Sequence, residues 1–148
     1  MKSIKKEGMK MEKNILYASS GIKYVLEYLK RNLGYKHRNV RPINQGRYYI
    51  VYGEPNTAIV FKRDWFYKFK EICGGEGIGE SINVEDLKEM IKSEVKIIYI
   101  LHSSGQIYKI DIMDYLLNSI SWRNKENKEV RSISVHLLER VNKEEVSI

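Results

Sequence analysis

The chain has 148 residues, a net charge of +7 and a pI of about 9.3. Its hydrophobic content of 43% and charged content of 30% exclude an intrinsically disordered chain, and the length fits one domain with a sizeable core. The longest uninterrupted apolar run, residues 97–101, is far shorter than the roughly 18 residues that a membrane span needs. The excess of positive charge favours a polyanionic partner such as nucleic acid.

The cysteine and histidine content bears on location and on metal binding. Cys73 is the single cysteine, so no disulfide can form within the chain, and a cytoplasmic protein without a signal peptide is expected. His37, His102 and His136 are far apart, and no CxxC or HxxxH spacing occurs. We therefore expect no zinc site.

The N-terminal third is the basic part of the sequence. Residues 1–13 are charged and without periodicity, which predicts a basic flexible arm ahead of one globular domain, residues 14–148. Residues 19–33 place apolar side chains at helical spacing and predict a helix. Residues 30–47 then hold six Lys and Arg, no acid and an interleaved Tyr35. This pattern is typical of phosphate contact and base stacking; a solvated connection between helix and strand is the alternative.

Two β-hairpins follow. Residues 48–52 and 58–61 are aromatic and β-branched runs separated by GEPNT, and residues 95–102 and 106–110 flank a Ser-Ser-Gly turn. Residues 58–61 are apolar on both alternating faces, as in a strand covered on both sides. The lysine and arginine that follow this strand stand where a site could form.

Helices are expected around the hairpins. One is predicted at residues 65–73, a second after Asn83, and a third after Asp111 or Asp114, because these short polar side chains cap helix N-termini. Between the first two, residues 74–80 read GGEGIGE. This glycine-rich run lacks the GxGxxG spacing and carries acids that would repel phosphate, so a flexible loop is expected.

The C-terminal part predicts a polar loop at residues 122–129, a last strand at residues 130–135 and a short closing helix at residues 136–142. The element order is helix, hairpin, helix, helix, hairpin, helix, strand. It predicts an α/β or α+β domain with a single mixed sheet of about five strands, flanked by helices.

Residues 19–62 resemble the start of the PD-(D/E)XK nuclease core, the fold of restriction endonucleases and archaeal Holliday junction resolvases. The matching features are a helix with Glu27, a Gly-Tyr turn, and the strands RYYIVYGE and AIVFK, in which Lys62 stands at the motif lysine. The acid two residues before the lysine is replaced by Val60. No aspartate stands in residues 48–53, and Glu54 is the acid nearest the place where the family has one.

The resemblance implies a nucleic-acid-binding domain, with DNA as the expected partner, in which catalysis is degraded because an acid that would hold Mg²⁺ is missing. No cofactor is expected in that case. The candidate phosphate contacts are the basic residues Lys36, Arg38, Arg41, Arg47, Lys62 and Arg63.

Two alternatives remain open. The first is an active Mg²⁺-dependent DNA endonuclease with Glu27, Glu54 and Lys62 as catalytic residues. The second is a protein-interaction or assembly domain, including a homodimer, in which some of the eleven tyrosines and two tryptophans form an interface.

Overall fold

The computed structural model describes residue 31 and residues 39–141. The described strands and helices are, in chain order, β1 (Asn39–Ile43), β2 (Tyr48–Tyr52), β3 (Thr57–Lys62), α2 (Phe69–Cys73), β4 (Gly79–Asn83), α3 (Val84–Lys92), β5 (Ile97–His102), β6 (Ile107–Asp111), α4 (Ile112–Asn118), β7 (Ile120–Arg123), β8 (Glu129–Ser134), the 3₁₀ turn η1 (Val135–Leu137) and β9 (Glu139–Val141). The fold is mixed α and β, as the sequence predicts. None of the described helices is long and apolar enough to cross a membrane.

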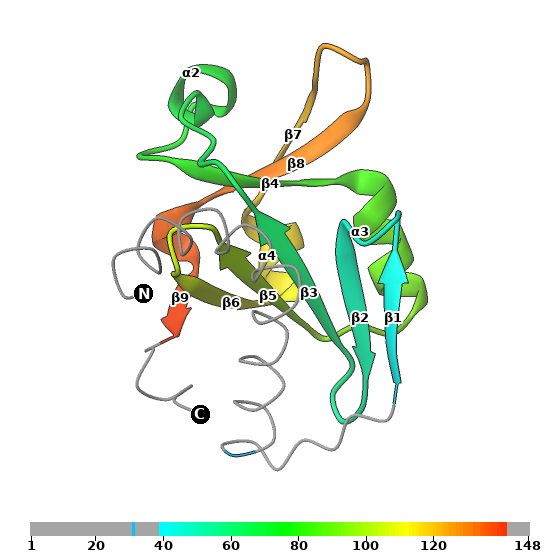
Figure 1. The fold of residues 1–148 in the computed structure, drawn as a ribbon. Coiled ribbons are helices and arrows are strands. Elements are labelled where there is room, and N and C mark those ends of the chain that lie inside the picture. The colour runs from blue at the N-terminus through cyan, green and yellow to red at the C-terminus, as the bar shows by residue number, and fades with distance from the viewer. Residues whose placement is uncertain (1–30, 32–38, 142–148) are drawn as a thin grey trace, which may run out of the picture.

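The larger sheet has six strands in the order β1-β2-β3-β5-β6-β9 (Figure 1). Strands β1, β2 and β3 form an antiparallel meander, β3 pairs with β5 in parallel, and β6 pairs antiparallel with β5 and β9. Both predicted hairpins are therefore present. A parallel pair requires a long crossover, and the chain between β3 and β5 supplies it with α2, β4 and α3.

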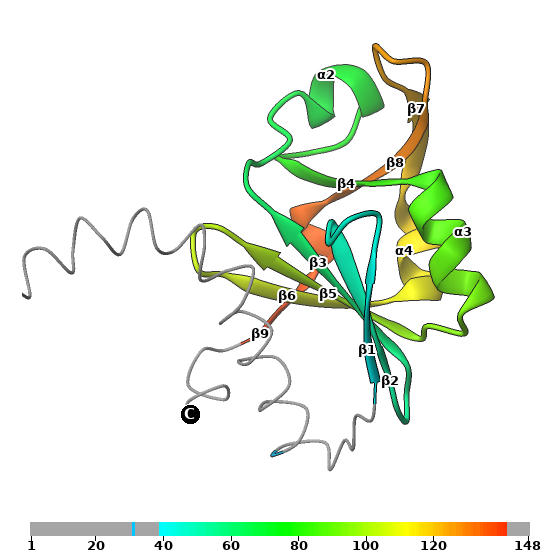
Figure 2. The ribbon, with the colours of Figure 1, turned by 45° about the vertical axis from the view of Figure 1, so that its right-hand side comes forward.

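A second sheet of three strands has the order β4-β8-β7. The expectation of a single sheet of about five strands was wrong, because strands also form in segments expected to be a basic connection, a glycine-rich loop, a polar loop and a closing helix. Strand β4 begins within the glycine-rich run, β7 overlaps the expected polar loop, and the expected closing helix is η1 followed by β9. Figure 2 shows β4 and β8 crossing one face of the larger sheet, on the same side as α3 and α4.

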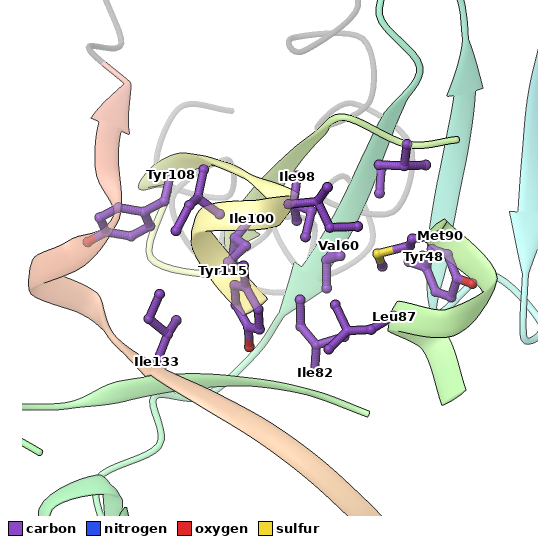
Figure 3. Close-up of a cluster of buried hydrophobic side chains, with 14 of the residues drawn as sticks. Tyr48, Val60, Ile82, Leu87, Met90, Ile98, Ile100, Tyr108, Tyr115 and Ile133 are labelled. Carbon is purple, nitrogen blue, oxygen red and sulfur yellow. The ribbon is translucent and has the colours of Figure 1, made fainter. Parts of the chain in front are cut away.

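The principal core fills the space between the two sheets. It includes Val60 and Ile100 from the larger sheet, Ile133 from the smaller one, and Leu87 and Tyr115 from α3 and α4 (Figure 3). A second apolar cluster on the opposite face of the larger sheet draws its buried residues from β2, β3, β5, β6 and β9. Strand β3 contributes to both clusters, as its continuous apolar sequence predicts.

The helix caps agree with the sequence in position. Asn83 and Asp111 are the N-cap residues of α3 and α4. The Oδ1 of Asp111 accepts a hydrogen bond from the backbone N–H of Met113 at 2.8 Å, whereas Asn83 makes no side-chain capping bond. The helix expected at residues 65–73 begins only at Phe69, because Phe66 pairs with Gly79 in an isolated β-bridge.

Candidate functional site

Lys62 is the last residue of β3 and lies opposite His102 of β5 in the parallel pairing. It has the same parity along the strand as Ala58 and Val60, so its side chain lies on the face that covers the principal core. Here the apolar interior ends in a small cavity of about 40 Å³, whose lining includes Lys62, Arg47 and Asp86. The sequence prediction that charge gathers at the end of this strand agrees with this geometry.

Asp86 and Arg47 reach this position from two different elements. Asp86, in the first turn of α3, is 4% exposed and accepts hydrogen bonds from Asn44 Nδ2 and, at 3.5 Å, from Arg47 Nη1. The β1–β2 turn brings both donors there, with Asn44 and Gln45 at positive φ, a conformation that asparagine adopts more readily than most residues. Burial raises the pKa of Asp86, and Arg47, Asn44 and Lys62 act against this rise.

Glu80 is the most unusual residue of the site. It belongs to β4, is 1% exposed, and neither of its carboxylate oxygens has a hydrogen-bond partner within the described part of the chain. Burial raises its pKa from 4.5 to about 7, and the positive charge of Lys62 works in the opposite direction. Burial in turn lowers the pKa of Lys62, against the attraction of Glu80 and Asp86. The end of β3 thus brings Lys62 within electrostatic reach of two carboxyl groups of low exposure.

Sequence reasoning missed both of these carboxyl groups, although each leaves a signal. Glu80 stands two residues after Ile78 and two before Ile82, a spacing that places all three side chains on the same, apolar face of a strand. Asp86 stands four residues before Met90 and shares its buried helix face. The glycines and acids of residues 74–80 favoured a loop, and the spacing of Glu80 between two isoleucines was therefore not interpreted as a strand.

The structure does not bring all the predicted catalytic residues together. Glu54 lies in the β2–β3 turn, next to the start of β3 at Thr57. Lys62 is the last residue of β3. The five intervening steps of about 3.3 Å separate the two ends by roughly 16 Å, so Glu54 is not a partner of Lys62. Val60, at the missing motif acid, is buried in the principal core. Glu27 lies outside the described residues.

Some of the predicted phosphate contacts are already paired with carboxylates, and others are not. Arg47 and Arg41 bind the α3 carboxylates of Asp86 and Glu89, at 3.5 and 3.3 Å, and Arg41 also lies over the ring of Tyr52. Arg63 is exposed and makes no ion pair within the described residues. The remaining candidates, Lys36 and Arg38, lie outside the described residues.

An aromatic layer joins the site to the smaller sheet. The ring of Trp65 stacks on that of His102 with centroids 3.6 Å apart, and the ring of Phe66 stacks on that of Trp122 at 5.2 Å. The Nδ1 of His102 accepts the backbone N–H of Ser104 at 3.1 Å. Its Nε2 is buried without a partner among the described residues, and burial lowers the pKa of this imidazole.

A metal centre is not formed by the described residues. Within residue 31 and residues 39–141, no group of three or more His, Cys, Asp or Glu side chains is placed to hold a metal ion. Glu80 and Asp86 are the two carboxyl groups that act on Lys62. What the arrangement can do is hold or exchange a proton at the strand end and present positive charge beside it.

No family model, curated protein or solved structure matches this chain.

Proposed function

We propose that this protein is a nucleic-acid-binding domain that uses a nuclease-like arrangement of strands for binding and does not cut. The observation that carries the proposal is the distribution of charge. Residues 39–141 contain 15 Lys and Arg against 14 Asp and Glu and are almost neutral, whereas residues 1–38 contain 10 against 3 and hold a net charge of +7. Such concentrated positive charge favours binding to phosphates.

The described part of the site supports binding more than cleavage. Lys62 closes the second of two adjacent strands, as the nuclease resemblance implies. The acid of the motif is replaced by the buried Val60, and Glu54 lies at the far end of the strand. A Mg²⁺-dependent mechanism needs carboxylate oxygens around the metal, and the described residues offer only Glu80 and Asp86 near Lys62.

The test compares Arg63→Ala with the full-length parent in a fluorescence anisotropy titration of labelled DNA over a salt series. Each phosphate contact contributes about 0.9 to the slope of log affinity against log salt, so losing Arg63 should lower the affinity and flatten the slope by about one unit. Lys109→Ala is the matched control, since it removes the same charge from a lysine already paired with Glu139 at 3.7 Å. Equal effects of the two substitutions would contradict the assigned surface.

A second variant addresses the basic segment. Lys36→Ala combined with Arg38→Ala should flatten the salt slope further, by up to about two units, since it removes two candidate contacts. Arg41→Ala should have a smaller effect than either basic-segment substitution alone, because Glu89 already neutralises this guanidinium. An unchanged slope in the double variant would argue against phosphate binding by this segment.

An active endonuclease is the second candidate, and one observation favours it: the buried carboxyl groups of Glu80 and Asp86 lie where they act on Lys62. Since the described residues supply no third ligand, this candidate also depends on Glu27. It predicts cleavage of DNA with Mg²⁺ or Mn²⁺ that is lost in Lys62→Ala. The absence of cleavage of duplex, branched and single-stranded DNA with either ion would remove it.

A further inference from the structure

An exposed tyrosine follows the strand end that holds Lys62. Tyr67 lies between β3 and α2 and is 71% exposed, the largest exposure among the aromatic residues in the described part of the chain. The two aromatic residues before it, Trp65 and Phe66, are engaged in the stacking layer. Of these three consecutive aromatic residues, Tyr67 is the one that is exposed, whereas Trp65 and Phe66 are half-buried.

The backbone directly before Tyr67 is held by a pair of hydrogen bonds. The N–H of Phe66 donates to the carbonyl of Gly79, and the N–H of Gly79 donates to the carbonyl of Phe66, each at 3.0 Å. The ring of Phe66 lies parallel to that of Trp122, with an angle of 6° between the planes. Because these contacts fix the residue directly before Tyr67, the backbone that carries this ring is already positioned before a ligand binds.

The charges around Tyr67 suit a phosphate chain. Arg63, Lys68 and Lys70 are exposed, and none of them takes part in an ion pair within residues 39–141. Within four residues of Tyr67 the acids are Asp64 and Glu71, against these three cations, so the segment keeps a net positive charge. Arg63 precedes Tyr67 by four residues, so the two backbone positions lie within about 14 Å of each other even if the chain is fully extended.

We propose that Tyr67 is a stacking platform for an unpaired nucleobase, with Arg63 and Lys68 as phosphate contacts, so that single-stranded nucleic acid is the preferred ligand. The inference rests on the proposed nucleic-acid binding and names the form that is bound. An exposed aromatic ring beside cations is the combination that binds unpaired bases, because every base offers a π-face. In a duplex these faces are covered by neighbouring base pairs, and Tyr67 has no base to stack on.

The experiment measures anisotropy with a labelled oligothymidine and with a duplex of the same length, at one fixed low salt concentration. Tyr67→Ala should weaken binding of the single strand by roughly fivefold to a hundredfold, the range expected for losing one base–aromatic stack. Tyr67→Trp should retain single-strand binding. Affinity for the duplex should change less than about twofold in both variants, since no base face is available there.

Two controls separate stacking from charge and from surface hydrophobicity. An oligonucleotide with abasic sites keeps the phosphates but removes the bases, and its binding should not respond to Tyr67→Ala. Leu117→Ala removes another exposed apolar side chain, 76% exposed on α4, and should leave both ligands bound as in the parent.

Equal losses for single strand and duplex, or no loss in Tyr67→Ala, would overturn the stacking assignment while nucleic-acid binding itself stands. Failure of the parent protein to bind any nucleic acid would instead overturn the proposed function. The two failures are therefore distinguishable in one set of titrations.

Discussion

Replacing the buried carboxyl group of Glu80 by an amide tests the electrostatics of the site. In the unfolded chain this carboxyl group loses its proton near pH 4.5, whereas burial in the fold holds its pKa at about 7. Between these values the folded state binds more protons than the unfolded state, so stability falls as pH rises. At about 1.4 kcal/mol for each pKa unit, the difference amounts to roughly 3 kcal/mol by pH 7.5.

The assay is urea unfolding at pH values from 4.5 to 8, with the free energy of unfolding compared between the parent and Glu80→Gln. The parent should lose roughly 3 kcal/mol more than the variant across this range, because glutamine does not titrate. At pH 8 the variant should therefore keep a larger share of the free energy of unfolding that it has at pH 4.5 than the parent does. The subtraction cancels the contribution of Asp86, whose pKa burial also raises.

Glu126→Gln is the control, since Glu126 is exposed and its side chain lies 3.8 Å from Lys128 in an exposed ion pair. Its stability curve should run parallel to that of the parent. Parallel curves for Glu80→Gln as well would refute the reasoning, because Glu80 would then titrate alike in the folded and unfolded chains.

Two further predictions concern the elements around the site. Tyr115→Phe removes a hydroxyl that donates to the carbonyl of Arg131 at 2.8 Å. It should lower the free energy of unfolding in urea titrations by about 1–2 kcal/mol. An unchanged value would show that this buried hydrogen bond does not stabilise the fold. Asp111→Ala removes the N-cap of α4 and should cost about 1 kcal/mol of stability, while Asp114→Ala in the same helix should cost less; equal costs would contradict the capping role.

The sequence predicted two of the four strand pairs that are contiguous in the chain, β2–β3 and β5–β6. It missed β1–β2 and β7–β8, because polar and charged residues made β1 look like a connection and the end of β7 like a loop. Both predicted hairpins were recognisable because their strands and turns are contiguous, and the continuous apolar run of residues 58–61 identified β3 as a central strand. The parallel pairing of β3 with β5 and the pairing of β4 with β8 join segments separated by 40 to 55 residues. No local pattern encodes such pairings, so neither the parallel pair nor the place of β4 beside β8 was predicted.

Two residues of the site, Lys62 and Arg47, were predicted, and the carboxyl groups around them were missed. Lys62 was identified because it ends an apolar strand. Its neighbours Glu80 and Asp86 come from the second sheet and from α3, and only the packing of those elements brings them to it. Glu54 is close in sequence but lies at the other end of an extended strand, where proximity along the chain does not mean proximity in space.

The most direct test of the account is a titration of the full-length protein with labelled single-stranded, duplex and branched DNA over a salt series, with and without Mg²⁺, followed by a gel of the same samples. We expect binding that weakens steeply with salt, is tightest for the single strand, and leaves the DNA uncut. No binding at low salt would contradict it and would favour a protein-interaction domain.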